Sequence, residues 1–202
     1  ALDNQEQLKH YSQRFAEKGF AEYLFEWYLK EGKQGKMLSS STTANNQKLD
    51  AFLSNHDSLK WLHQLHSRRY KDASSTLKKL GLLEENCVAR RKTMLSIGKL
   101  ALITSGDTNY SDFDDQLRFL QYQSDLSDSL LRKNDLDRKT MPVLSPKQLV
   151  DILISGAEGP NEDLKNFQKA LEIAEIIERR YSIDLHRQIL FKIWQKAFEK
   201  DE

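Results

Sequence analysis

Apolar residues recur at intervals of three and four along almost the whole chain, with polar residues between the runs. This spacing places them on one face of an α-helix, and no run alternates in the manner of a strand. The pattern predicts about ten helices, over residues 5–17, 20–30, 49–53, 57–65, 70–80, 84–103, 112–133, 145–155, 160–177 and 183–198.

Turn-forming residues separate these segments. Gly19, Gly32 and Gly81 are expected to end helices, residues 38–46 have the composition of a loop, and Asp57 is a candidate N-cap. Ser145 followed by Pro146 is typical of a helix start.

We therefore expect an all-α fold, an irregular helical solenoid or stack of helical hairpins. The predicted organisation is one domain fragment over 1–202, because the chain opens and closes within helix-like sequence. It comprises a first hairpin (1–38), basic central helices (44–104) and C-terminal helices (112–202).

Composition narrows the class of protein. With three prolines and eight glycines among 202 residues, the chain is poor in helix breakers, which argues against an all-β sandwich. The single cysteine, Cys87, allows no internal disulfide and fits a reducing compartment. No apolar stretch reaches the roughly twenty residues of a membrane span.

Motifs for catalysis or cofactor binding are missing: there is no Gly-rich phosphate loop, nucleophile elbow or paired-cysteine zinc spacing. We expect no enzyme activity and no cofactor. A metal site at His56, His63 and His66 beside Asp57 is the strongest exception. The alternative is that these histidines flank a core stripe.

Three further features each have a structural alternative to a functional reading. Cys87 is expected to be a buried structural cysteine, not a reactive thiol. The acidic residues at 112, 114 and 115 favour a helix N-terminus over a calcium loop, because the glycine and closing glutamate of such a loop are missing. The aromatic residues at 23, 25, 27 and 28 surround their helix, which indicates core packing instead of base stacking.

The predicted helix over 84–103 is unusual because it is apolar on two faces. At about 100° per residue, its natural core face holds Cys87, Met94, Leu95, Gly98, Ala101 and Leu102. Ile97 and Leu100 lie nearly opposite, with Thr93 between them. Arg90 borders this second patch, and Lys92 and Lys99 lie in the gap on its other side. Such a helix is either enclosed by neighbours or offers one face to a partner.

Charge is distributed unevenly within a chain of net charge +1. Residues 60–102 hold ten basic and three acidic side chains, whereas residues 107–137 hold eight acidic and three basic ones. Basic residues around an apolar patch suit a partner with acidic surroundings. The alternative is that the patch packs on a neighbouring helix and the lysines are solvated.

The run HYSQRFAEKGFAEYLFEWYLKEGKQGK, at residues 10–36, resembles the C-terminal helical domain of animal scaffold nucleoporins. These are the one-hundred-thirty-three-kilodalton members of the Y-shaped nuclear pore subcomplex. The resemblance continues through LKWLHQLHSRRY, ARRKTMLSIGKLAL and MPVLSPKQL, and it is weak over residues 107–137.

The resemblance implies an α-helical stack at the end of the complex's long stem. It implies binding to the C-terminal helices of the neighbouring one-hundred-seven-kilodalton nucleoporin through the helix ARRKTMLSIGKLAL, contacts with other subunits, and support of mRNA and protein transport. The expected contact residues are Arg90, Lys92, Thr93, Ile97, Lys99 and Leu100. Arg90 replaces a lysine of the family pattern, and Ile97 replaces a leucine.

The implied location is the nuclear pore complex at the nuclear envelope, with the kinetochore in mitosis. The family's N-terminal propeller is not part of the region that this chain resembles, so we expect no membrane contact by this chain. The family domain continues beyond residue 202, so we expect an exposed apolar edge at Ile193 and Trp194. A separate alternative is a nucleic-acid-binding module that uses the basic residues Arg68, Arg69, Lys71, Lys78, Lys79, Arg90, Arg91 and Lys92.

Overall fold

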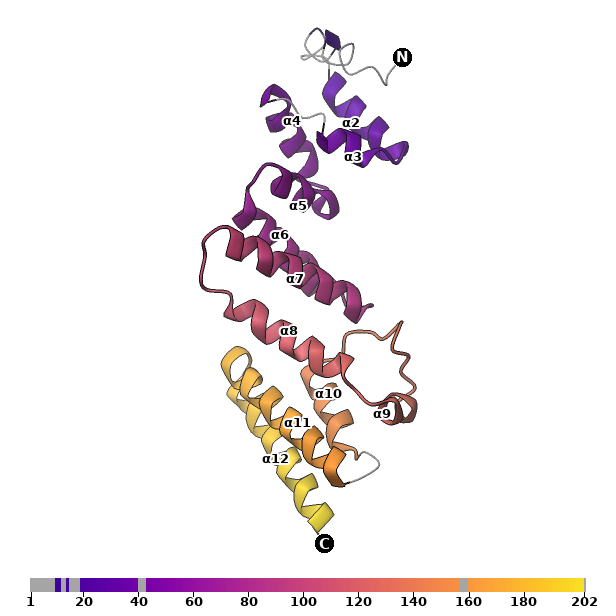
Figure 1. Ribbon diagram of the computed structural model, residues 1–202, viewed down its shortest axis with the longest axis vertical. Coiled ribbons are helices and arrows are strands. Elements are labelled where there is room, and N and C mark those ends of the chain that lie inside the picture. Colours follow the sequence, from indigo (N-terminus) through magenta and orange to yellow (C-terminus); the bar gives the residue numbers. More distant parts are fainter. Residues whose placement is uncertain (1–9, 12–13, 15–18, 40–42, 157–159, 202) are drawn as a thin grey trace.

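The computed structural model describes residues 10, 11, 14, 19–39, 43–156 and 160–201. Every regular element among these residues is an α-helix, and the helices follow one another along an elongated stack (Figure 1). The all-α prediction is therefore confirmed. His10, Tyr11 and Arg14 are helical, and the rest of the helix expected over 5–17 lies outside the described residues.

The described helices keep the order of the sequence from one end of the stack to the other. They are α2 (Phe20–Lys30), α3 (Gln34–Ser39), α4 (Thr43–Leu53), α5 (Asp57–His66), α6 (Tyr70–Leu83), α7 (Val88–Thr104), α8 (Ser111–Ser124), α9 (Asp128–Lys133), α10 (Pro146–Ile154), α11 (Pro160–Arg180) and α12 (Ile183–Asp201).

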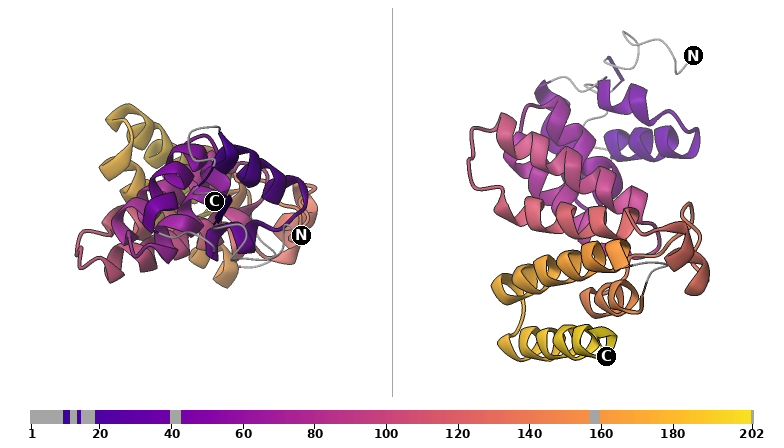
Figure 2. Two further views of the ribbon diagram at one scale, coloured as in Figure 1. Left: turned by 90° about the horizontal axis from the view of Figure 1, so that it is seen from above. Right: turned by 60° about the horizontal axis from the view of Figure 1, so that its bottom comes forward.

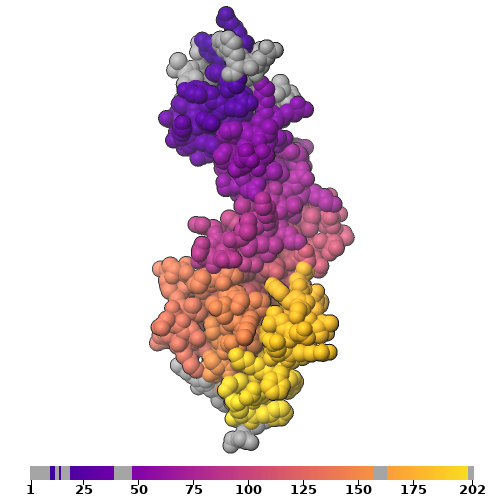
Figure 3. Space-filling view, turned by 180° about the vertical axis from the view of Figure 1, so that it is seen from behind, coloured from indigo at the N-terminus to yellow at the C-terminus, as the bar shows by residue number. Residues whose placement is uncertain are grey.

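Successive layers build the stack. Helices α6 and α7 form its most extensive helix–helix contact, α8 lies on α7, and α11 and α12 follow as further layers (Figure 2, right). Helix α10 packs on α11 and α12, while α9 and the connector after it lie to one side (Figure 1). Seen from behind, the surface is long and narrow (Figure 3).

Two apolar clusters form the described core. The first lies in α2–α4 and includes Phe25, Tyr28 and Leu53. The second extends from α7 to α12 and includes Leu95, Phe113 and Ile173. Phe25 and Tyr28 confirm core packing for part of the aromatic run, but Tyr23 is 66% exposed and its assignment to the core was wrong.

The expected loop over 38–46 was too long. Helix α3 extends to Ser39 and α4 begins at Thr43. The serine- and asparagine-rich residues that suggested a loop therefore include the end of one helix and the start of the next. The N-cap of α5 is His56, and Asp57 lies in the first turn instead. There the Asp57 carboxylate accepts a hydrogen bond from Lys79 at 2.6 Å, which lowers its pKa.

The sequence suggested that Gly81 ends a helix, but this is wrong: α6 continues to Leu83. A Cβ added at Gly81 would lie 2.9 Å from Leu95 Cδ2, so this glycine permits the close approach of α6 and α7. The helix expected over 112–133 is two helices. Ser127 begins the second, α9, and its hydroxyl accepts a hydrogen bond from Leu130 N at 3.4 Å.

The start of α10 confirms the Ser145–Pro146 signal. The Ser145 hydroxyl accepts a hydrogen bond from the Gln148 amide at 3.3 Å, and the Gln148 side chain accepts one from Ser145 N at 2.9 Å. This reciprocal pair is a capping box, which satisfies two backbone donors that a helix end leaves unpaired.

Replacing the capping serine should destabilise the chain. We expect Ser145→Ala to reduce the free energy of unfolding by about 1 kcal/mol, the usual cost of losing such a cap. Ser58→Ala is the control, because Ser58 is an exposed serine within α5. Urea unfolding followed by circular dichroism would measure both, and equal losses would contradict the capping role.

Candidate partner-binding surface

Helix α7 lies between α6 and α8, and the face it turns toward them is the one expected from the sequence. Leu95, Gly98 and Ala101 are buried there, while Cys87, Met94 and Leu102 are half-buried. Cys87 is the N-cap residue of α7, so the helix begins at Val88 and not at 84. The expected core face is thus confirmed, although Cys87 is less deeply buried than predicted.

The opposite side of α7 is uncovered by the described residues, and we call it the open face. Its members are Arg90, Thr93, Ile97, Leu100, Ile103 and Thr104. Leu100 is 63% exposed and Ile103 is 46% exposed, whereas Ile97 is half-buried. Ile103 was not predicted to belong to the second apolar patch. A helical rotation of about 100° per residue places it on the Lys99 side of Leu100, where it extends the apolar strip.

The hydroxyl groups on the open face are satisfied within the helix. Thr93 Oγ1 donates to Ala89 O at 2.9 Å, and Thr104 Oγ1 donates to Leu100 O at 2.8 Å. A partner that covers these threonines therefore need not supply them with acceptors. At the N-terminal end of the face, the exposed Arg90 guanidinium lies 3.3 Å from a Glu84 carboxylate oxygen.

The two lysines expected in the binding site lie on the side of α7 that faces α8. Lys99 forms an ion pair with Asp114, and its ammonium group lies 4.9 Å from the centre of the Tyr110 ring. Lys92 donates a hydrogen bond to Gln121 Oε1 at 2.5 Å. Both ammonium groups are therefore engaged within the chain, and the structure groups Thr93, Ile97 and Leu100 separately from them.

Internal ion pairs account for much of the uneven charge. Basic side chains of the central helices contact carboxylates of the chain itself: Arg69 with Asp50 at 2.5 Å, Lys71 with Asp107 at 3.5 Å, Lys78 with Asp112 at 2.5 Å, Lys79 with Asp57 at 2.6 Å, and Lys99 with Asp114. These pairs neutralise much of the basic surface that a nucleic-acid-binding module would need.

The histidine cluster does not form a metal site. Among the described residues, no group of three histidine, cysteine or acidic side chains is placed to hold a metal ion. His63 is fully buried with its Nε2 atom 3.3 Å from Asp50 Oδ1, and burial lowers its pKa against the opposing effect of that carboxylate. None of the described helices has the length and apolarity to cross a bilayer.

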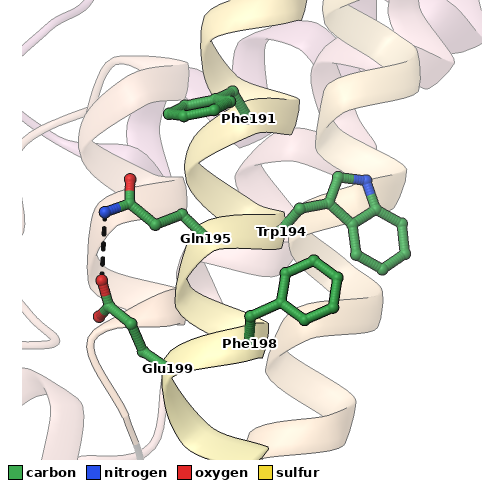
Figure 4. A pocket seen from close by; sticks show the side chains of 5 residues that line it. All are labelled: Phe191, Trp194, Gln195, Phe198 and Glu199. Carbon is green, nitrogen blue, oxygen red and sulfur yellow. Dashed lines mark hydrogen bonds between the residues drawn. The ribbon is translucent and has the colours of Figure 1, made fainter.

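A second apolar surface lies on α12. Phe191, Trp194 and Phe198 are each more than half exposed on this helix. Trp194 and Phe198 point to one side, and Phe191 points to the other, where Gln195 donates a hydrogen bond to Glu199 at 3.1 Å (Figure 4). The apolar edge expected at Ile193 and Trp194 is correct for Trp194. It is wrong for Ile193, which packs into the core with 1% exposure.

Tyr122 on α8 forms a hydrogen bond with Glu172 on α11. Burial raises the pKa of this tyrosine to about 12, and the neighbouring carboxylate adds to the effect. A raised folded-state pKa gives stability that is complete below pH 10 and is lost as the pH rises through about 12. We expect the melting temperature to fall over this range, and to fall less in Tyr122→Phe. Circular dichroism would measure both melting temperatures. An equal fall in the two proteins would show that Tyr122 does not cause the loss of stability.

A known family and several individual proteins are similar to this chain. The profile of the family "Non-repetitive/WGA-negative nucleoporin C-terminal" matches residues 1–155. Helices α2 to α10 fall within the matched part, including α7 and its open face.

Individual relatives match nearly the full length of the chain. The nuclear pore complex protein Nup133 of Danio rerio is 36% identical over 206 residues, covering 98% of the chain and 18% of that protein. The human Nup133 is 34% identical over 205 residues, with the same coverage, and the Drosophila melanogaster protein is 26% identical over 202 residues. The chain thus spans 18% of the length of its zebrafish and human relatives.

Proposed function

Because the chain belongs to the non-repetitive/WGA-negative nucleoporin C-terminal family, we propose that it is a structural link that joins neighbouring subunits of the nuclear pore scaffold. It is a nucleoporin of the nuclear pore complex, in agreement with the location expected from the sequence. The proposed role is binding, without catalysis, and through the scaffold it would support transport of mRNA and protein.

The observation that carries this proposal is the open face of α7. Leu100 and Ile103 remain exposed on a helix whose other side is packed against α6 and α8. A rigid helix that presents a strip of apolar side chains suits a partner helix, which would remove those side chains from water. Burial of a few central residues commonly supplies most of the energy of such an interface.

The partner we propose is the C-terminal helical region of the one-hundred-seven-kilodalton nucleoporin of the Y-shaped complex. Leu100 and Ile97 would form the centre of the contact, and Arg90 would lie at its edge. Because Lys92 and Lys99 are engaged with α8, they would act mainly by holding α7 in place. The pairing of the basic residues favours this protein partner over nucleic acid.

Titration calorimetry of the chain with that helical region tests the proposal. We expect saturable binding with one partner per chain. Binding should depend only weakly on salt, because the centre of the contact is apolar. Absence of binding by a chain with the helical circular dichroism of the intact fold would contradict this partner. Binding to a DNA duplex that weakens steeply with salt would instead support the nucleic-acid alternative.

A further inference from the structure

His63 is a buried titratable side chain that the proposed partner contact does not use. It lies on α5 and is fully buried, and neither of its ring nitrogens has a hydrogen-bond partner among the described residues. Buried polar atoms are nearly always hydrogen-bonded, so an imidazole enclosed in this way is unusual. The enclosure suits the neutral ring, because burying a charge is far more costly than burying a neutral polar group.

The carboxylate of Asp50 on α4 lies beside this ring, but it is already engaged by a cation. Asp50 Oδ1 lies 3.3 Å from His63 Nε2, and the same oxygen accepts a hydrogen bond from the Arg69 guanidinium at 2.5 Å. Because Arg69 balances the charge of Asp50, a proton on His63 would add a second positive charge to this group. His66, on the same helix as His63, has a further and smaller effect. Within the described part of the chain, these three side chains are the charged or titratable groups that act on the ring.

The pKa of His63 therefore lies below the usual value of 6.5, because burial outweighs the opposing effect of Asp50. With a lowered folded-state pKa, the opened chain takes up the proton before the folded chain does as the pH falls. The stability that depends on the neutral ring is complete above pH 6.5 and is lost progressively below it.

His63 also lies at a boundary between two parts of the core. Helix α5 packs extensively on α6 and less extensively on α4 (Figure 1). The apolar cluster of α2–α4 includes Leu49 and Leu53, and Leu59 of α5 packs against it, whereas the second cluster begins at α7. Loosening of α4 from α5 would therefore weaken the first cluster and leave the second one intact.

We propose that His63 makes the packing of α4 on α5 sensitive to acid. While the ring is neutral, it fills the space beside Asp50 and the two helices stay packed. Uptake of a proton by the ring favours the opened arrangement, in which the imidazolium reaches water, and the helices from α7 onward keep their fold. This device lies away from the open face of α7 and does not depend on the proposed partner contact.

Hydrogen exchange measured by mass spectrometry at pH 7.5 and pH 5.5 tests this device. Protection factors, which remove the direct effect of pH on amide exchange, would be compared for α4 and α11. We expect the protection of α4 to fall by about tenfold at pH 5.5, because a proton taken up only in the opened state favours opening about tenfold one pH unit below 6.5. Helix α11 should keep its protection, since it belongs to the second cluster. Unchanged protection of α4, or an equal fall in α11, would overturn the proposal.

Two variants identify the group responsible. In His63→Gln the protection of α4 should be the same at both pH values, because the glutamine side chain does not titrate. The matched control is His66→Gln, the same substitution at an exposed histidine of the same helix, and it should retain the fall. A fall of undiminished size in His63→Gln would show that a different group responds to the acid.

A titration of the unsubstituted chain keeps the test decisive if His63→Gln fails to fold. Nuclear magnetic resonance of the His63 imidazole should give a pKa below 6.5. A pKa at or above 6.5 would mean that the folded chain does not resist protonation of this ring, and the proposal would fail. Neither measurement involves the partner, so loss of partner binding in calorimetry has no bearing on them.

Discussion

Leu100→Glu should weaken binding to the partner helix about 100-fold, or about 3 kcal/mol, as expected for a central apolar contact residue replaced by a charge. Leu100 is 63% exposed, so the free chain has little packing to lose at this position. In the complex, the glutamate would be buried on the apolar strip, and Lys99 is already paired with Asp114. Titration calorimetry would measure the loss of affinity.

The matched control is Leu164→Glu, the same substitution at a leucine of α11 that is 71% exposed. Both variants should melt close to the unsubstituted chain, since exposed substitutions usually change stability by less than about 0.5 kcal/mol. Only Leu100→Glu should lose affinity. Equal affinities of the two variants would place the contact on a different surface of the stack.

Ile97→Glu is a less selective test than the sequence suggested. The helical angle of Ile97 alone predicts that this substitution abolishes binding and leaves the melting temperature nearly unchanged. In the structure Ile97 is half-buried, although it lies on the open face of α7. A glutamate there would lose packing in the free chain as well, so a fall in affinity would be accompanied by a fall in melting temperature.

The sequence predicted the helices well where apolar spacing and end signals agree. Residues 20–30 were predicted with the bounds of α2, and the start of α10 followed from Ser145 and Pro146. It failed where one residue type serves two purposes. Glycine is common at helix ends, but Gly81 lies within α6 and permits close packing against Leu95. Leu95 belongs to α7, which begins seven residues after Gly81.

The two faces of α7 could be predicted from the sequence, but the partners of its charged side chains could not. Helical spacing within one segment separates Leu100 from Leu95. The pairing of Lys99 with Asp114 and of Lys78 with Asp112 depends on how α8 lies across α6 and α7. Opposite net charges in adjacent segments were visible beforehand, and they were interpreted as a surface for a partner. In the structure, much of that complementarity is satisfied between helices of the same chain.

Gly98→Val should reduce the free energy of unfolding by about 3 kcal/mol, at the upper end of the usual cost of overpacking. A Cβ added at Gly98 would lie 2.9 Å from Phe113 Cε1 and 3.3 Å from Leu77 Cβ. Phe113 is 3% exposed and Leu77 is fully buried, so neither can move into solvent. Gly98 therefore lies where side chains of α6 and α8 pack directly against the backbone of α7.

Thermal unfolding would measure the effect, with an expected fall in melting temperature of roughly 6–12 °C for a chain of this length. Gly35→Val is the control, because a Cβ added at Gly35 would meet no atom within 4 Å from other parts of the chain that the structure describes. Phe113→Leu would shorten the side chain that Gly98→Val meets, so the double variant should be more stable than the sum of the two single losses implies. Strict additivity would show that the ring does not oppose the added carbon. Because the same contact positions the N-terminal turn of α8, this glycine allows both the packing of α7 and the ion pairs around it to form.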